Sequence, residues 1–275
     1  MIVKKSLGQH FLRCDWVIDA LIRSAEITKA DTVLEIGPGT GILTRPLAAT
    51  AGQVIAVEKD EALAIQTTAA LQQESITNVT IIPADILSIS QTKSGIYSRL
   101  SLGTYKVVAN IPYYLTGRLI RLLLECPAKP SIIALTIQKE VAERIVAKPP
   151  HMNLLALGVQ AFGVPRIIKV VPAACFSPQP KVDSAIILIS DISDEFFVKN
   201  AIGQDTFFAL ARTAFNQKRK MLANSLASIV GSKEKSLALI RAAELSDTIR
   251  PEELSHDQWA ALCHAATLKN SSRPA

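Results

Sequence analysis

The sequence lacks the features of secreted and membrane-spanning proteins. Its 275 residues contain no run of about 18 apolar residues, so we expect no membrane-spanning helix. Polar residues follow Met1–Lys5 at once and leave no apolar core for a secretion signal. The sequence therefore predicts a cytoplasmic protein without membrane association.

Cysteine and histidine are scarce, with four residues of each. The cysteines show no C-x-x-C spacing, and the histidines do not lie at ligand spacing from them. Because zinc sites and disulfide frameworks have such spacings, the sequence predicts reduced thiols and no metal. The residues concerned are Cys14, Cys126, Cys175, Cys263, His10, His151, His256 and His264.

Internal repeats are absent, and the only low-complexity segment is the polar tail Lys269–Ala275. Hydrophobic residues make up 49% of the chain, which supports a substantial core in one large and one small domain. The 30 Lys and Arg residues outnumber the 24 Asp and Glu residues, giving a net charge of +6. This charge suits a polyanionic partner.

Apolar runs of strand length alternate with helical patterns as far as residue 190. This alternation predicts an α/β fold with a doubly wound, Rossmann-like sheet and helices on both faces. Helical patterns alone follow Phe196, so we expect an α/β domain at 1–190 and a small all-helical domain at 191–275. The predicted strands are Thr32–Ile36, Val54–Val57, Val79–Ile82, Tyr105–Asn110, Ser131–Gln138, Ala161–Val164, Ile167–Val171 and Val182–Ser190. The predicted helices are Ile42–Ala51, Thr116–Cys126, Lys139–Ala147, Thr206–Phe215, Lys218–Val230, Lys235–Ala243 and His256–Leu268.

A glycine-rich turn joins the first predicted strand to the first helix. Gly37, Gly39 and Gly41 let the backbone turn sharply and approach a ligand. A dinucleotide site needs G-x-G-x-x-G, whereas the spacing here is G-x-G-x-G without the third glycine of that motif. With Glu35 two residues before the turn, the pattern resembles the S-adenosylmethionine site of class I methyltransferases.

Carboxylates stand at the ends of the next two predicted strands. Glu58 can accept hydrogen bonds from both hydroxyls of a ribose. Asp85 can accept from an adenine amine. We assign the neighbouring Lys59 and Ile86 to the same cofactor site.

The segment Asn110–Tyr114 follows the strand that begins at Tyr105. An amine conjugated to a purine ring is a poor nucleophile. Two acceptors, the Asn110 side chain and the Ile111 carbonyl, can bind its hydrogens and free its lone pair. Tyr113 can stack on the base. An ordinary strand-ending turn is the alternative, because Asn and Pro favour turns.

Three prolines surround Phe176 on the approach to the last predicted strand. Each proline fixes φ and removes a donor, so we expect a stiff loop that holds the Phe176 ring outside the core. Opposite Tyr113, the ring would complete a sandwich around an extruded base. A core position for Phe176 is the alternative.

In these motifs the chain resembles the small-subunit ribosomal RNA adenine N6,N6-dimethyltransferase family. The resemblance covers nearly the whole chain, and several motifs in order are more specific than any one. The matching segments are Lys5–Leu12, Glu35–Gly41, Asn110–Thr116, Gln138–Arg144, Pro172–Ser184, Phe215–Lys220, Asn224–Leu226 and Arg250–Ser255. His10 and Pro149–Leu155 depart from the pattern, since many members carry Asn and a Tyr-Gly pair at these places.

The resemblance implies transfer of methyl groups from S-adenosylmethionine to N6 of two adjacent adenosines in the 3′-terminal hairpin of small-subunit rRNA. The implied partner is this rRNA or the pre-30S particle, and we expect a monomer. Catalysis would come from positioning and hydrogen-bond acceptance, without a strong general base. The implied catalytic positions are Asn110, Ile111, Pro112, Tyr113 and Phe176. The implied cofactor positions are Gln9, His10, Leu12, Glu35, Gly37, Gly39, Gly41, Glu58, Lys59, Asp85, Ile86 and Asn110.

Four basic residues, Arg212, Lys218, Arg219 and Lys220, open the predicted helical domain. They can bind phosphates, although a solvated helix face is the usual reading of such a run. Because these residues accompany an adenine site, we favour RNA binding. The bases of an RNA helix are poorly accessible to side chains, so proteins recognise such helices by their shape.

Three other functions stay open. A large-subunit rRNA adenine N6-methyltransferase of the macrolide-resistance type shares the catalytic motifs, but the match at Phe215–Leu226 argues against it. Retained cofactor positions disfavour a non-catalytic nucleic-acid-binding factor on the same fold. The missing third glycine disfavours a nicotinamide-dependent dehydrogenase.

Overall fold

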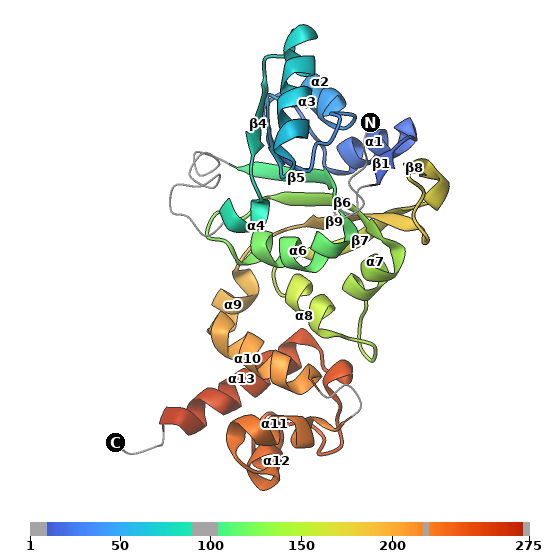
Figure 1. Cartoon of the computed structure of the whole chain (residues 1–275). Coiled ribbons are helices and arrows are strands. Elements are labelled where there is room, and N and C mark those ends of the chain that lie inside the picture. The colour runs from blue at the N-terminus through green and yellow to red at the C-terminus, as the bar shows by residue number, and fades with distance from the viewer. Residues whose placement is uncertain (1–9, 90–103, 217–219, 272–275) are drawn as a thin grey trace. The chain divides into compact units, whose positions relative to one another are not determined.

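A computed structural model describes residues 10–89, 104–216 and 220–271. The chain forms two compact units (Figure 1). The sheet unit comprises Met1–Glu143 and Gly163–Ile192, and the helical unit comprises Arg144–Phe162 and Ser193–Ala275. The predicted boundary at 190 lies near Ser193, but the helical unit also takes in Arg144–Phe162, which we had expected in the α/β domain.

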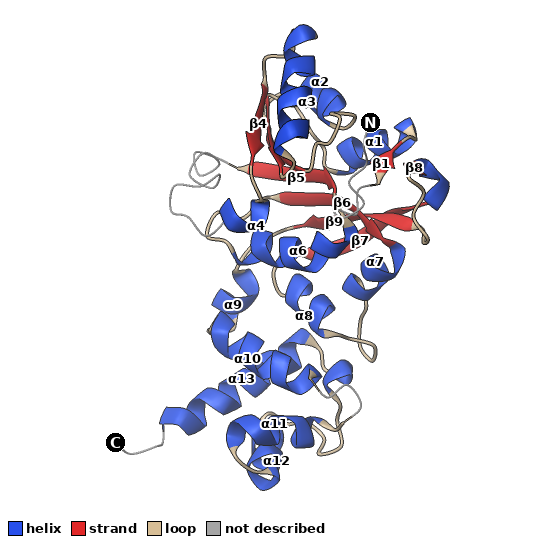
Figure 2. Cartoon of the chain, viewed as in Figure 1, coloured by secondary structure: helices blue, strands red, loops and turns tan. Residues whose placement is uncertain are grey.

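Strands of the sheet unit form one seven-stranded sheet in the order β4-β3-β2-β5-β6-β9-β7 (Figure 2). The pairs from β4 to β6 are parallel, and β9 runs antiparallel to both of its neighbours. The strands are β2 (Thr32–Ile36), β3 (Gln53–Glu58), β4 (Val79–Pro83), β5 (Tyr105–Asn110), β6 (Ile132–Gln138), β7 (Val164–Val171) and β9 (Ser184–Ser190).

The central strands are apolar on both faces because helices cover both faces of the sheet. Val33 and Leu34 on β2, and Val107 and Val108 on β5, are fully buried. Figure 1 shows α1, α2 and α3 on one side of the sheet and α4, α6 and α7 on the other, as predicted. These helices are α1 (Asp15–Ser24), α2 (Thr44–Thr50), α3 (Glu61–Gln73), α4 (Ile86–Ile89), α6 (Thr116–Glu125) and α7 (Lys139–Ile145), with short 3-10 turns η2 (Tyr113–Leu115) and η3 (Ala173–Cys175).

The strand order reverses between β2 and β5, because β3 and β4 lie on one side of β2 while β5 and β6 lie on the other. In open α/β sheets, such a switch point leaves a crevice at the carboxyl ends of the strands. The predicted cofactor and catalytic motifs follow the carboxyl ends of β2, β3, β4 and β5. The topology therefore brings them to one edge of the sheet.

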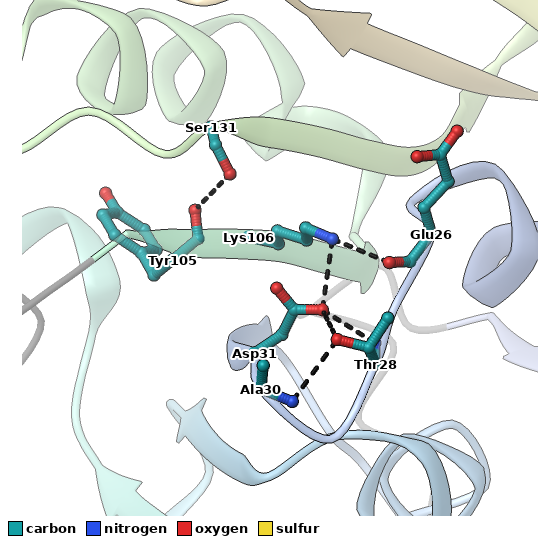
Figure 3. A network of polar contacts seen from close by, with 7 residues as sticks. All are labelled: Glu26, Thr28, Ala30, Asp31, Tyr105, Lys106 and Ser131. Atoms are coloured by element: carbon teal, nitrogen blue, oxygen red, sulfur yellow. Dashed lines mark hydrogen bonds and ion pairs between the residues drawn. The ribbon is translucent and has the colours of Figure 1, made fainter.

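A polar network holds the opposite edge of the sheet (Figure 3). On β5, Lys106 Nζ donates to the Glu26 carbonyl at 2.7 Å and pairs with Asp31 Oδ2 at 3.1 Å. The same carboxylate accepts from the backbone N–H of Thr28 at 2.7 Å and from its hydroxyl at 2.9 Å. With each of these groups satisfied by its neighbours, the network serves to anchor β2 and β5.

A two-stranded sheet ties the N-terminal segment to the loop before β9. β1 (Phe11–Leu12) pairs antiparallel with β8 (Phe176–Ser177), and Leu12 lies opposite Phe176. The Phe176 side chain is only 3% exposed and packs in the core with Leu12, Val171 and Ile186. The prediction of an exposed Phe176 ring was therefore wrong: pairing with β1 directs the ring into the core.

The pairing of β1 with β8 also brings two cysteines together, so the prediction that all four cysteines are reduced was wrong. Cys14 follows β1, and Cys175 directly precedes β8. The two residues form a disulfide with their Cα atoms 5.2 Å apart. They are separated by 161 residues, so their spacing in the sequence gave no sign of the pair. Cys126 and Cys263 are buried and lie outside this disulfide.

The helical unit is built around an aromatic cluster. Phe207 lies at its centre, with ring centroids 5.2–6.4 Å from those of Phe196, Phe197, Phe208 and Trp259. Its helices are α8 (Leu154–Gln160), α9 (Glu195–Lys199), α10 (Gln204–Phe215), α11 (Leu222–Val230), α12 (Lys233–Ala242) and α13 (His256–Ser271), with the 3-10 turn η4 (Pro251–Glu253).

Two predicted elements need correction. Ala161 ends α8 with its N–H bonded to the Leu157 carbonyl at 3.1 Å, so the predicted strand Ala161–Val164 is wrong and β7 begins at Val164. Helix α11 begins at Leu222 and not at Lys218. The helices α1, α3, α4, α8 and α9 were not predicted.

Candidate active site

An open cavity of about 210 Å³ lies at the carboxyl ends of β2, β3, β4 and β5. Most of the predicted cofactor and catalytic residues line it: His10, Leu12, Glu35, Gly37, Gly39, Glu58, Lys59, Asp85, Ile86, Asn110, Ile111, Pro112 and Tyr113. Gly41 and Phe176 are not in its wall, and Gln9 lies outside the described residues. The sequence reading missed Phe11, Tyr114 and Arg118, which also line the cavity.

The glycine turn after β2 has a backbone that only glycine adopts easily. Gly37, Gly39 and Gly41 have φ angles of +71°, +57° and +79°. A Cβ atom at Gly39 would also lie 3.0 Å from Cε1 of Phe11 in the cavity wall. The turn therefore keeps its backbone at the cavity surface.

Glu58 is buried at the end of β3, with both carboxylate oxygens engaged. Oε2 accepts the Gly39 N–H at 3.1 Å, and Oε1 accepts the Asp60 N–H at 2.9 Å. Each oxygen keeps a further lone pair. These two bonds fix Glu58 against the glycine turn, where it faces the cavity.

Glu35 is only 1% exposed, and its Oε2 has no hydrogen-bond partner among the described residues. Burial raises the pKa of Glu35 to about 8, and the negative charge of Glu58 acts in the same direction. Near neutral pH the Glu35 carboxyl is therefore largely protonated. It offers the cavity a buried polar group that a ligand can satisfy.

Asp85 lies at the rim of the cavity. Its Oδ2 pairs with Lys59 Nζ at 2.8 Å, and its Oδ1 accepts the Leu87 N–H at 3.0 Å. The hydrogen bond from Lys59 lowers the pKa of the Asp85 carboxyl. Asp85 therefore stays ionised and keeps its capacity to accept.

Asn110 is oriented by a contact with the N-terminal segment. Its Nδ2 group donates to the His10 carbonyl at 2.9 Å. This bond uses the donor side of the amide, which leaves Oδ1 as the acceptor available to a ligand.

Tyr113 is held from two sides. Its hydroxyl shares a 2.7 Å hydrogen bond with Ser184, and burial raises the pKa of that hydroxyl. The His10 ring stacks against Tyr113 with centroids 5.5 Å apart, while His10 Nδ1 donates to the Pro178 carbonyl at 2.6 Å. Phe176 lies in the core, and among the residues that the structure describes it is the His10 ring that stacks against Tyr113.

Of the four predicted RNA-binding residues, Arg212 is exposed on α10 and Lys220 is exposed just before α11. Lys218 and Arg219 lie outside the described residues. Within the ranges that the structure describes, no group of His, Cys, Asp and Glu residues could hold a metal ion. In the same ranges we find no helix with the length and apolar character needed to cross a membrane.

The switch-point sheet, the positive-φ glycine turn and the acidic residues at successive strand ends define a class I methyltransferase fold. Two solved structures share this fold: a dimethyladenosine transferase from Plasmodium falciparum (TM-score 0.78, 24% identity, covering 95% of this chain and 98% of that chain) and the 23S rRNA methyltransferase ErmE (TM-score 0.69, 23% identity, covering 93% and 98%).

Closer sequence relatives are ribosomal RNA small subunit methyltransferases A. One from Dehalococcoides mccartyi is 40% identical over 264 residues, which cover 94% of this chain and 87% of the relative. One from Lachnoclostridium phytofermentans is 40% identical over 270 residues, covering 95% and 90%. The family model for ribosomal RNA adenine dimethylase matches residues 2–267, so the chain belongs to this family of S-adenosylmethionine-dependent enzymes.

Proposed function

We propose that the chain transfers methyl groups from S-adenosylmethionine to N6 of two adjacent adenosines in the 3′-terminal hairpin of small-subunit rRNA. The products are N6,N6-dimethyladenosines. The observation that carries the proposal is Asn110, whose amide is fixed by His10 so that its acceptor oxygen is left for an amine at the cavity. The cavity lining also combines this acceptor with the glycine turn and Glu58.

The cavity fits S-adenosylmethionine in the chemistry of its polar groups. Glu58 and Asp85 are acceptors suited to a ribose and an adenine amine. The buried Oε2 of Glu35, which has no partner among the described residues, can bond to the polar amino-acid end of the molecule. When bound, the cofactor supplies an activated methyl group.

Asn110 and Ile111 would receive the target amine. Acceptance of its hydrogens by the Asn110 oxygen and the Ile111 carbonyl keeps the nitrogen lone pair directed at the methyl group. The lone pair would attack the methyl carbon in line with its C–S bond, S-adenosylhomocysteine would leave with the electron pair of that bond, and the methylated amine would lose a proton to solvent without a strong general base.

Tyr113 supplies a stacking surface for the target base. Its hydroxyl bond to Ser184 keeps the ring in place, which lowers the entropy lost on binding. The His10 ring covers one face of Tyr113, so the target base would stack on the other face, and the buried Phe176 supplies no second surface.

The helical unit would bind the rRNA outside the target hairpin. Arg212 and Lys220 are exposed there, and Lys218 and Arg219 directly precede Lys220. We propose that the enzyme acts in the cytoplasm as a monomer on rRNA within the pre-30S particle.

The decisive experiment is incubation of the purified chain with S-adenosylmethionine and under-methylated small subunits, followed by mapping of modified nucleotides. Large subunits serve as the parallel substrate, and an Asn110→Ala variant serves as the inactive control. We expect two dimethylated adenosines in the 3′-terminal hairpin of small-subunit rRNA. Methylation of large subunits alone, or binding of rRNA without turnover, would overturn the proposal.

A further inference from the structure

The rim of the cavity carries an exposed aromatic ring that the proposed chemistry does not use. Tyr113 and Tyr114 are neighbours in the η2 turn, and both line the cavity. Tyr113 is held inward by Ser184, whereas the Tyr114 side chain is 58% exposed. A large ring in a short ordered turn at the mouth of a binding cavity offers a preformed stacking surface at little cost in entropy.

An exposed cation lies one helical turn beyond this ring. Arg118 is four residues after Tyr114, in the first turn of α6, and it also lines the cavity. It makes no ion pair with any residue that the structure describes. The other cations nearby are compensated, since Arg121 pairs with Glu125 at 2.8 Å and Lys59 pairs with Asp85 at 2.8 Å.

The helix surface at Gly117 is open. Gly117 precedes Arg118 on α6, and a Cβ atom added there would meet no atom within 4 Å. Tyr114 and Arg118 are themselves exposed, so a ligand can contact both side chains at the cavity. A guanidinium with no ion-pair partner among the described residues, one helical turn from an exposed ring, suits a phosphate joined to a base.

We propose that Tyr114 and Arg118 form a subsite for the nucleotide next to the target adenosine. This inference rests on the proposed function, because a base in the cavity brings its covalently linked neighbour to the rim. The Tyr114 ring stacks on the neighbouring base, and the Arg118 guanidinium binds the backbone phosphate. Since the proposed substrate has two adjacent adenosines, the subsite holds one while the other is methylated.

Steady-state kinetics on under-methylated small subunits test the subsite. Tyr114→Ala should raise KM for the subunits about tenfold, as expected for the loss of one stacked base, with little change in kcat. Tyr114→Phe keeps the ring and should behave as the parent does. Arg118→Ala should raise KM and reduce the slope of log affinity against log salt by about one. Arg121→Ala, on the same helix but outside the cavity wall, is the matched control and should keep the parent's slope.

Two further arms make the test specific. Gly117→Glu adds bulk and negative charge beside the subsite, and it should weaken subunit binding while leaving S-adenosylmethionine affinity unchanged by calorimetry. A second substrate carries uridine in place of the neighbouring adenosine. The KM of the parent should be higher for this substrate than for the unchanged subunits, whereas the KM of Tyr114→Ala should differ much less between the two substrates.

Three outcomes are separable. If the parent does not methylate small subunits, the proposed function fails. If the parent is active but the Tyr114 and Arg118 variants match it in KM and salt slope, the subsite is refuted. A loss of S-adenosylmethionine affinity with an unchanged KM for subunits would also refute it, because the two residues would then belong to the cofactor site.

Discussion

The Asn110 side-chain amide is the main acceptor for the target amine in the proposed reaction. Its Nδ2 bond to the His10 carbonyl fixes which atom meets the substrate. Asn110→Ala should lower kcat by a factor on the order of 10² or more, because it removes an acceptor needed most in the transition state. Single-turnover methylation measures this loss, and circular dichroism should show that the variant is folded.

Asn78→Ala is a matched control for this substitution. The Asn78 amide donates to the carbonyls of Ala48 and Ala51, away from the cavity. This variant should lower thermal stability while leaving turnover per folded molecule unchanged. Parent-like turnover in Asn110→Ala would contradict the assignment.

Glu35 makes stability depend on pH. Its folded pKa of about 8 lies above its ordinary value of 4.5. Between these values the folded protein holds a proton that the unfolded chain has lost, so stability falls as pH rises, by about 1.4 kcal/mol per pH unit for one proton.

The Glu35→Gln variant has no titratable group at this position. The free energy of unfolding of the parent minus that of Glu35→Gln should therefore decrease as pH rises from about 5 to about 8, and then level off. Urea denaturation of both proteins at several pH values measures the difference, in which the other titrating groups largely cancel. A difference that is constant with pH would contradict the raised pKa.

Phe176 acts through packing in this structure. Phe176→Ala should destabilise the fold by about 3–5 kcal/mol, because it leaves a cavity in the core beside Leu12 and Ile186. Phe176→Leu should cost less, since it retains more of the buried volume. If both variants unfold at the parent's urea concentration but methylate slowly, the ring acts at the site and the core assignment fails.

The β1 and β8 strands form an element whose stability depends on the Cys14–Cys175 pair. Because this disulfide closes a long stretch of chain, replacing both cysteines by Ser should destabilise the protein by about 2–4 kcal/mol. Alkylation after unfolding without reductant, read by mass spectrometry, should label Cys126 and Cys263 alone. Labelling of all four cysteines would show that the protein is reduced.

Elements with a strong local pattern were predictable from sequence. The strand β5 has the predicted bounds, because a β-branched run between polar residues gives a clear strand signal. The helix α3 was missed because Ala and Thr fill much of it and leave a weak apolar period. The two-residue strands β1 and β8 have no period at all.

The same distinction explains which parts of the site were predictable. Glu58, Asp85 and Asn110 each follow a recognisable strand, and parallel strands bring their carboxyl ends together. Phe176 and the Cys14–Cys175 pair depend on β1 meeting β8, a contact between distant parts of the chain that local patterns do not encode. Tyr114 and Arg118 could have been found from their spacing of four residues at the start of the helix that follows Asn110–Pro112.

At the scale of the whole molecule, the two units differ in composition in a way that suits separate tasks. The sheet unit contains the whole cavity, including its acidic residues. The helical unit has an aromatic core and carries the exposed Arg212 and Lys220. We infer that chemistry belongs to the first unit and RNA affinity largely to the second, so substitutions can separate them.

Replacing Lys218, Arg219 and Lys220 together by Ala should weaken binding to small subunits. It should also reduce the slope of log affinity against log salt by roughly three, because three fewer counterions are released on association. Binding across a salt series measures the slope, and calorimetry should show parent-like S-adenosylmethionine affinity. The matched control replaces Lys199, Lys233 and Lys235, three exposed lysines elsewhere in the helical unit, and removes the same charge. If both triple variants change the slope equally, net charge alone explains the effect. If the first variant keeps the parent's slope, the basic run is a solvated surface and other residues bind the rRNA.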